Sequence, residues 1–215
     1  MEQKDIIKAV KQARESKKRN FKQGFDLIIN LKNIDLKKQD NQIDLYVMVK
    51  HPPKKKKICA LIGAELKDEA SKVCDLAILS DSFPEYSEKK KARQLAQDHD
   101  YFIAQANVMP KVANIFGRVF GVRGKMPNPK AGCVVPPKAN LGPLYEKLQN
   151  TIRVTAKSAP IVQCGLGNEE MKDEDLADNV HTIYNAVLHK LPNERNNIKS
   201  VFVKFTMGKP APVKF

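Results

Sequence analysis

The residues best suited to recognise another molecule lie near the C-terminus, in the segment KFTMGKP at 204–210. Thr206 offers a hydroxyl group that donates and accepts hydrogen bonds, and Met207 offers a flexible apolar surface that can lie against a base or a sugar. Gly208 lets the backbone approach a partner closely. This set suits recognition of a ribose edge and a base face in folded RNA. A strand end with a buried methionine and a turn glycine explains the same residues equally well.

A second candidate cluster lies in SKKRNFKQGFDL at 16–27. Its first aromatic side chain, Phe21, is surrounded by four cations, namely Lys17, Lys18, Arg19 and Lys22. Basic side chains interleaved with an aromatic one are a pattern of RNA-contacting surfaces, although a solvated helix end is the commoner use of such a run. Two interpretations, a phosphate grip or a solvated linker, also apply to the four lysines at 54–57.

A glycine-rich basic loop, GRVFGVRGKMPNPKAG at 117–132, raises the question of a nucleotide site. A Walker loop requires Ser or Thr after its Gly-Lys pair, but Met126 follows Gly124 and Lys125. A dinucleotide fingerprint follows the first strand of its unit, whereas this segment comes near the end of one. We interpret it as a rigid surface loop, stiffened by prolines, whose cations can still meet phosphate. These cations are Arg118, Arg123, Lys125 and Lys130.

Other residues give little support to catalytic, metal or cofactor chemistry. The histidines are scattered along the chain, at His51, His99, His181 and His189, and no serine has a G-x-S-x-G context. The four cysteines form no C-x-x-C pair and no zinc spacing, and three of them sit in apolar surroundings, so we expect buried free thiols. The sequence therefore predicts no enzymatic activity, no metal and no cofactor.

The overall composition points to a polyanionic partner. The chain has 215 residues, of which 38 are Lys or Arg and 24 are Asp or Glu, giving a net charge of +14. Such an excess attracts nucleic acid, an acidic membrane or an acidic protein. There is no apolar run of about 18 residues, and the first ten residues carry charge where a signal peptide is apolar. We therefore expect a soluble protein of the cytoplasm.

The two ends of the chain share one pattern of elements, an α+β pattern. Residues 4–18 have helical apolar spacing, and 173–191 form a second amphipathic helix whose start we expect Asp173 to cap. Strands are expected at 25–31, 43–49, 152–156, 160–167 and 198–205. The first two strands are close in sequence and are expected to pair antiparallel. Ser200 lies six residues before Thr206, so a period of two places them on the same strand face.

The middle of the chain alternates short apolar strands with helices. Strands are expected at 58–63, 75–80 and 100–105, with helical segments at 64–73, 88–99, 107–120 and 140–151. This rhythm predicts a parallel sheet with crossovers, a Rossmann-like three-layer α/β domain. We therefore predict a discontinuous α+β domain, 1–57 and 153–215, with an antiparallel sheet and helices. An α/β domain at 58–152 is inserted into it, and the prolines and lysines at 50–57 mark a hinge.

Five segments together resemble a known family. They are NFKQGFDLIINLKNIDLKK, FIAQANVMPKV, GRVFGVRGKMPNPKAG, LADNVHTIYNAV and IKSVFVKFTMGK, in this order and spread over essentially the whole chain. The set resembles the family of ribosomal protein L-one, the protein of the mobile stalk beside the tRNA exit site, in its archaeal or eukaryotic form. The resemblance implies two domains joined by two hinge strands, the first of which binds folded large-subunit ribosomal RNA.

Carried onto this sequence, the family's RNA-binding face consists of Phe21, Lys22, Gly24, Asp26, Gly167, Ser200, Lys204, Thr206, Met207 and Gly208. Further candidate phosphate contacts are Lys18, Arg19, Arg123 and Lys125. The resemblance also implies other ribosomal components and exit-site tRNA as partners, repression of translation through the protein's own mRNA, and a monomer when free.

Two positions depart from the family's pattern. Gly24 stands where Ser or Thr is usual, so one hydroxyl contact to RNA is missing or is replaced by a backbone group. Val122 stands where proline is common in the loop, which leaves that loop's shape less defined. Two other functions are kept as alternatives: an enzyme that uses a nucleotide cofactor in the α/β domain, and a basic adaptor for an acidic protein.

Overall fold

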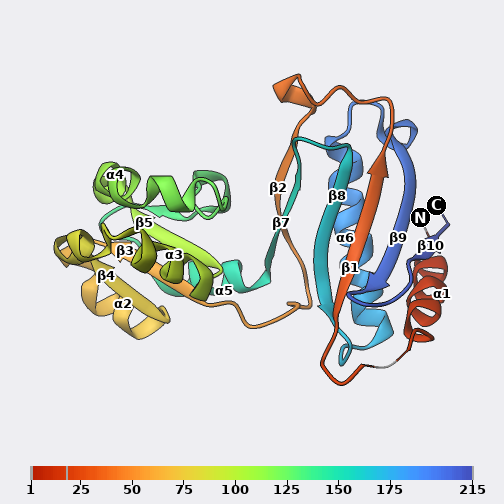
Figure 1. The fold of residues 1–215 in the computed structure, drawn as a ribbon, viewed down its shortest axis with the longest axis horizontal. Helices are drawn as coiled ribbons and strands as arrows, with labels where there is room; N and C mark the ends of the chain where they lie inside the picture. Colours follow the sequence, from red (N-terminus) through yellow and green to blue (C-terminus); the bar gives the residue numbers. More distant parts are fainter. Residues whose placement is uncertain (1, 18, 215) are drawn as a thin grey trace. The chain divides into compact units, whose positions relative to one another are not determined.

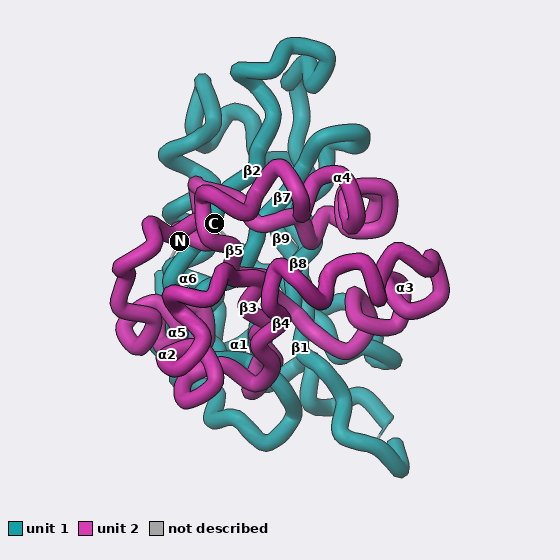
Figure 2. The backbone as a smooth tube through the Cα atoms, turned by 90° about the vertical axis from the view of Figure 1, so that its left-hand side faces the viewer, with its two compact units in different colours: residues 1–54, 150–215 teal, residues 55–149 magenta. Residues whose placement is uncertain are grey.

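The computed structural model describes residues 2–17 and 19–214, which fold into two compact units. Unit 1 comprises Met1–Lys54 and Asn150–Phe215, and unit 2 comprises Lys55–Gln149 (Figure 2). The chain therefore passes from one unit to the other twice. An antiparallel sheet with helices in the first unit and a parallel sheet in the second confirm the predicted fold class.

Sheet A is the main sheet of unit 1 and is antiparallel throughout. Its strands lie in the order β10-β9-β1-β8 (Figure 1). They are β1 (Gly24–Leu31), β8 (Ile161–Asn168), β9 (Ile198–Phe205) and β10 (Ala211–Val213). Along β1 every second residue is buried, from Phe25 to Leu31, because the sheet packs against a core on one face.

Two helices cover that buried face of sheet A: α1 (Gln3–Arg14) and α6 (Asp173–Lys190). Figure 1 shows α6 behind the strands and α1 at the edge of the sheet, next to β10. The apolar stripe of α1 is buried at Ile6, Val10 and Ala13, as the spacing predicts. The opposite face of the sheet carries no helix among the described residues of unit 1, so the alternate side chains of β1 stay half-exposed.

The expected pairing of the first two strands is wrong. Both edges of β1 are occupied, by β8 and β9, so β2 (Ile43–Met48) has no place beside it. Instead β2 pairs antiparallel with β7 (Thr151–Ala156) to form the two-stranded sheet B. Short sequence separation favours a hairpin, but a longer-range partner that buries a full strand edge prevails here.

Asp173 does not cap α6 as expected. The capping position is Lys172, and the Asp173 carboxylate accepts a hydrogen bond from Arg14 Nε at 2.6 Å. Three acidic residues in the first turn still suit the positive end of the helix dipole. Arg14 also donates to the carbonyls of Glu169 and Met171, so it fastens α1 to the loop before α6.

Unit 2 contains sheet C, a parallel sheet in the order β4-β3-β5-β6. Figure 2 shows α2 and α5 on one side of it and α3 and α4 on the other. The strands are β3 (Ile58–Ile62), β4 (Leu76–Leu79), β5 (Tyr101–Gln105) and β6 (Val134–Val135). The helices are α2 (Lys67–Val73), α3 (Lys89–Asp98), α4 (Met109–Phe120) and α5 (Leu141–Asn150).

Short 3₁₀ helices complete the fold at Gln39–Asn41, Ala64–Leu66, Ser80–Tyr86, Ala106–Val108, Pro129–Ala131 and Glu194–Asn197. Every residue of β3 is buried, as a parallel strand covered on both faces requires. Within residues 2–17 and 19–214, no helix has the length and apolarity needed to cross a membrane.

Candidate nucleic-acid interface

The Thr206–Gly208 segment forms a tight turn that is tied to the start of β1. The backbone N–H and the hydroxyl of Thr206 both donate to the Gly24 carbonyl, at 3.0 and 3.2 Å. The Gly208 N–H donates to the carbonyl of Phe205 at 2.8 Å. Because its proton is directed at Gly24, the Thr206 hydroxyl can offer its two lone pairs to a partner as an acceptor.

Gly24 fits this turn because it has no side chain. A Cβ atom at Gly24 would lie 3.2 Å from Thr206 Oγ1, closer than an ordinary contact. Position 24 therefore has no side-chain hydroxyl, and its backbone carbonyl accepts two hydrogen bonds from Thr206.

The buried side chain of Gln23 also holds this turn in position. Its side chain is only 3% exposed, and its Oε1 atom accepts the Met207 N–H at 3.2 Å. Its own carbonyl accepts the Glu169 N–H at 3.0 Å, which connects the loop before α6. Nothing in the sequence pattern distinguishes Gln23 from a solvated polar residue, so it was absent from the predicted site.

Two predicted site glycines serve internal packing. A Cβ atom at Gly208 would meet Ser16 Oγ at 2.9 Å, so the close approach predicted for a partner is made by the end of α1. At Gly167, which is buried, a Cβ atom would meet Leu176 and Met171 at 2.5 and 2.6 Å. Both glycines shape the interface without having a side chain to present to a ligand.

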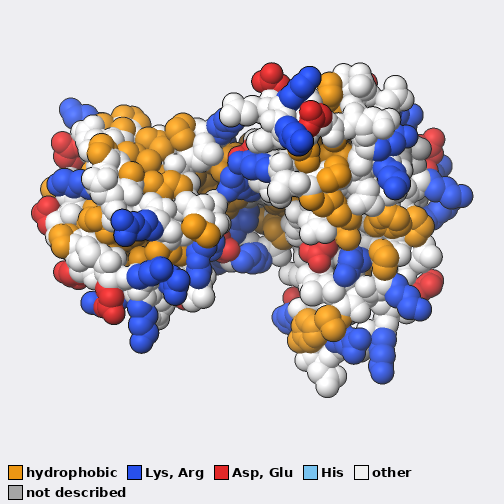
Figure 3. Space-filling model, turned by 45° about the horizontal axis from the view of Figure 1, so that its top comes forward, with side chains coloured by type: hydrophobic (Ala, Val, Ile, Leu, Met, Phe, Trp, Pro, Cys, Tyr) orange, Lys and Arg blue, Asp and Glu red, His pale blue; other side chains and the backbone are white. Residues whose placement is uncertain are grey.

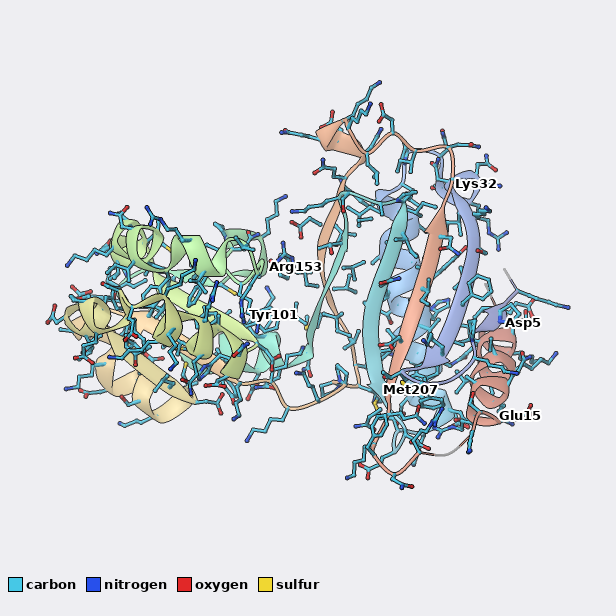
Figure 4. All side chains as sticks on the ribbon, in the orientation of Figure 1. Asp5, Glu15, Lys32, Tyr101, Arg153 and Met207 are labelled. Atoms are coloured by element: carbon cyan, nitrogen blue, oxygen red, sulfur yellow. The ribbon has the colours of Figure 1, made fainter. Side chains whose placement is uncertain are left out.

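Met207 and Phe21 are large apolar side chains left in solvent. Met207 is 58% exposed and Phe21 is 53% exposed. Figure 4 places Met207 at the end of sheet A where β1 begins, opposite the end marked by Lys32. Exposure contradicts the alternative of a buried methionine at a strand end. Apolar side chains held in water on a fixed turn are typical of a surface that a partner covers.

The open face of sheet A continues from this turn. Asp26 on β1 lies directly opposite Lys204 on β9 and Gly165 on β8. Partial burial raises the pKa of the Asp26 carboxyl above its usual value, and the Lys204 ammonium opposes that rise. A shallow depression of about 310 Å³ runs past Asp26, Lys204 and Gln163. Carboxylate, ammonium and amide groups together can recognise hydroxyl and base-edge groups.

Ser200 lies far from the turn, although it shares the strand. It pairs with Asn30 near the end of β1, and its hydroxyl accepts from Asn30 Nδ2 at 2.9 Å. Six residues of extended strand span roughly 20 Å, so Ser200 and Thr206 occupy opposite ends of the open face. The period-two prediction identified a shared face but not a shared site.

The predicted cations of unit 1 differ in their partners. Lys22 forms an exposed ion pair with Glu170 at 2.7 Å. Arg19 is exposed and has no ion pair with any described residue. Lys18, the third candidate phosphate contact in this loop, lies outside the described residues.

In unit 2 the structure gives Lys125 another partner. Its Nζ atom donates to the carbonyls of Ala96 and His99 at 2.7 and 2.6 Å, at the C-terminal end of α3. Cations at that position satisfy unpaired carbonyls and the negative end of the helix dipole. Arg123 stays exposed on the same loop. The loop takes left-handed backbone angles at Gly124 and Gly132, with φ of 65° and 78°, in agreement with a turn-forming role for its glycines.

Lys56, within the lysine run at 54–57, behaves like Lys125. It is 5% exposed and donates to the carbonyls of Leu148 and Gln149 at 3.2 and 2.8 Å, at the end of α5. Its ammonium also lies over the Tyr101 ring, 5.5 Å from the centroid. This lysine therefore fits neither a phosphate grip nor a solvated linker.

The crevice where Rossmann-like sheets bind nucleotides is filled in unit 2. The direction in which successive strands are added to sheet C reverses between β3 and β5. In such a sheet a ligand would lie past the carboxyl ends of these two strands. The buried Gln105 side chain occupies this position, accepting from Gly63 N at 2.8 Å and donating to Glu65 at 3.0 Å. The Gln105 side chain fills the position, and the Glu65 carboxylate beside it would repel a phosphate group. Among the described residues no group of three His, Cys, Asp or Glu side chains could hold a metal ion.

Comparison with known proteins identifies the family. The model described as "Ribosomal protein L1p/L10e family" matches residues 11–209. The chain belongs to this family. Large ribosomal subunit protein uL1 of Nanoarchaeum equitans is 42% identical over 207 residues, covering 94% of this chain and 96% of that protein. The protein of the same name from Methanothermococcus thermolithotrophicus is 40% identical, with both chains covered completely. That from Pyrococcus abyssi is 40% identical, covering 97% and 95%.

Membership of the L1p/L10e family confirms the resemblance predicted from the five segments. It also confirms the prediction that the chain is not an enzyme, since the family consists of ribosomal proteins. The three relatives named above come from archaea, in line with the archaeal or eukaryotic form of the family that the five segments resemble.

Proposed function

We propose that the chain is a constituent of the large ribosomal subunit in the cytoplasm and binds large-subunit ribosomal RNA through unit 1. The RNA surface is defined here as the loop at 19–24, the turn at 206–208 and the open face of sheet A around Asp26 and Lys204. One observation carries this proposal. Segments more than 180 residues apart are locked together by bonds from Thr206 to Gly24 and from Met207 to Gln23, with apolar side chains left exposed.

Each part of the RNA surface supplies a different kind of contact. Met207 and Phe21 offer faces on which a base or ribose can lie. Thr206 and Asp26 accept hydrogen bonds from ribose hydroxyls or base amino groups. Arg19 and Lys204 attract phosphates, and this attraction weakens with salt. Ser200, bound to Asn30 at the far end of the face, contacts RNA only where the bound RNA extends along the whole sheet.

Substitution of Met207 tests the RNA surface most directly. Met207→Asp removes an apolar contact and places a carboxylate against phosphates, so affinity for a fragment of large-subunit rRNA falls by about 2–3 kcal/mol, roughly 30- to 150-fold in Kd. Filter binding at one fixed salt concentration measures this. Met48→Asp is the matched control, because Met48 is equally exposed, at 57%, on strand β2 of the same unit. Equal affinities of the two variants contradict the proposal.

Finer functions follow from the family rather than from the geometry. We propose that the chain assists release of exit-site tRNA through movement of unit 2 on its two connections, and that it represses its own mRNA. Large subunits reconstituted without the chain then release deacylated tRNA more slowly. A reporter carrying the chain's own mRNA leader is repressed by the wild-type chain but not by Met207→Asp. Unchanged release or unchanged repression removes the respective function without affecting rRNA binding.

A basic adaptor remains the alternative binding function, and the two differ in what copurifies. Material absorbing near 260 nm that nuclease removes supports RNA. An acidic protein that stays bound after nuclease treatment supports the adaptor. We expect the free chain to be a monomer, which sedimentation measures.

A further inference from the structure

A groove beside the Thr206–Gly208 turn is a second feature of unit 1, and it extends beyond the part of the RNA surface formed by Arg19, Met207 and Gly208. It has a volume of about 570 Å³ and lies between the end of α1 and the segment 207–211. Its walls include Glu15, Ser16, Lys17 and Arg19 on one side and Lys209 on the other. A groove of this size is in the range of small-ligand sites and can hold one nucleotide.

The charge of this groove is strongly positive. Lys17, Arg19 and Lys209 face a single acid, Glu15. None of these three cations forms an ion pair with a described residue, in contrast to Lys22, which is bound to Glu170. Three cations that share one concave site repel each other, and an anionic group between them relieves that repulsion.

Parts of the groove are fixed by the fold. Its floor lies where Gly208 packs against Ser16, with no space for a side chain at 208. One wall starts at Gln12 on α1, whose buried stripe anchors the helix on sheet A, and continues through residues beyond the end of the helix, namely Glu15, Ser16, Lys17 and Arg19. The other wall leads into β10, where Ala211 pairs with Val203 of β9. The ends of the two walls, at Gln12 and Ala211, are therefore held in place before a ligand binds, which lowers the entropy cost of binding.

Met207 connects the groove to the RNA surface. This side chain is exposed and also lines the groove. Figure 4 shows Met207 and Glu15 at the same end of unit 1. When an RNA chain places a base or ribose on Met207, the neighbouring phosphate of that RNA consequently lies beside Lys209 and Arg19.

We propose that this groove binds the sugar-phosphate of one RNA nucleotide next to the nucleotide that lies on Met207. The proposal rests on the proposed function of unit 1 and extends it. Lys17, Arg19 and Lys209 hold the phosphate, and Glu15 accepts a hydrogen bond from a ribose hydroxyl or a base amino group. Lys17 and Lys209 are thereby added to the RNA-binding residues.

A paired-variant experiment tests the groove. The double variant Lys17→Gln, Lys209→Gln is compared with Lys190→Gln, Lys199→Gln, which removes the same charge from exposed positions at the end of α6 and the start of β9. Affinity for the rRNA fragment is measured from low to moderate salt. For the groove variant, log K falls less steeply with log salt, by about 0.7–1.8 in the slope, because one or two phosphate contacts are lost. At low salt its Kd rises about tenfold, whereas the control pair changes Kd less than threefold.

Equal behaviour of the two pairs overturns the proposal. Met207→Asp separates this failure from failure of the proposed function. If Met207→Asp weakens binding and the two pairs behave alike, RNA binds unit 1 without using the groove. If Met207→Asp has no effect either, the RNA surface itself is wrong. Circular dichroism of all variants checks that they are folded, and no buried side chain is altered in either pair.

Discussion

Unit 1 contains 22 Lys and Arg residues against 14 Asp and Glu, and unit 2 contains 16 against 10, so both units carry excess positive charge. Figure 3 shows more Lys and Arg than Asp and Glu on the face it presents. The units differ in the partners of these cations. In unit 2, Lys56 and Lys125 direct their ammonium groups at carbonyls that end helices α5 and α3. In unit 1, Lys17, Arg19 and Lys209 face an open groove.

Charge counts alone therefore do not locate an interface. A lysine that caps a helix contributes to net charge and to stability, but its ammonium is committed to the protein's own backbone. A lysine without such a partner keeps its attraction for phosphate. If this comparison is correct, removing a cation that is bonded to helix-end carbonyls in unit 2 lowers stability, while removing cations from the groove lowers RNA affinity.

Lys125→Met gives the largest expected effect on stability. The substitution keeps the aliphatic length but leaves the carbonyls of Ala96 and His99 without their charged donor, so unfolding free energy falls by about 2 kcal/mol. Urea unfolding measures this. Lys130→Met on the exposed part of the same loop is the control, with a change under about 0.5 kcal/mol. RNA affinity should be the same for both variants, and a selective loss for Lys125→Met would return this lysine to the phosphate contacts.

Gln23→Leu tests whether a buried side chain of unit 1 supports RNA binding as well as stability. The variant removes the acceptor of the Met207 N–H, so the turn loses its fixed position and RNA affinity falls about five- to tenfold, near 1 kcal/mol. Gln42→Leu is the control, because it removes a similar single bond, to the Leu36 carbonyl, in another loop of unit 1. Both variants lose some stability. Only Gln23→Leu is expected to weaken RNA binding, and equal RNA affinity would make Gln23 a purely structural residue.

The sequence allowed the fold class and most elements to be predicted, because apolar periodicity reports burial directly. The stripe of α1 and the continuous apolar run of β3 are examples. Pairing partners were harder to predict. The choice of β7 over β1 as partner of β2 depends on which edges other strands have already filled, and no local pattern encodes this.

As with the fold, part of the candidate site could be predicted from the sequence and part could not. Residue chemistry identified Thr206 and Met207, and the exposed Met207 fits that expectation. Gln23 and Lys209 depend on neighbours that come from the other end of the chain, so their roles appear only in three dimensions. Conversely, Lys125 resembles a phosphate ligand in sequence and binds carbonyls in the structure.

Two carboxylates of unit 1 extend the comparison from cations to anions. Asp44 on β2 accepts hydrogen bonds from Arg153, at 3.0 and 3.1 Å, and an ion pair from Lys157 at 2.7 Å. Burial alone would raise the pKa of the Asp44 carboxyl, but the bonds from Arg153 and Lys157 outweigh it, and the pKa is lowered. Asp26 is also partly buried, and for its carboxyl burial outweighs the attraction of Lys204, so its pKa is raised. The fold thus stabilises the ionised form of Asp44, whereas it disfavours the ionised form of Asp26 on the RNA surface.

Substitution by Asn should therefore change stability with opposite pH dependence at the two sites, and this is the smallest effect we predict. Because the pKa of Asp26 is raised by folding, wild-type stability falls as pH rises from the unfolded value of 3.8 through the folded pKa, and Asp26→Asn lacks this loss. Relative to wild type, Asp26→Asn gains stability between pH 3 and pH 7. The pKa of Asp44 is lowered, so its contribution is present above pH 3.8 and lost as pH falls through the folded pKa, and Asp44→Asn loses stability relative to wild type over the same range. Urea unfolding of wild type and both variants at the two pH values decides the matter: if Asp26→Asn loses stability relative to wild type between pH 3 and pH 7, the Asp26 carboxylate stabilises unit 1 and is not held there at a cost to the fold.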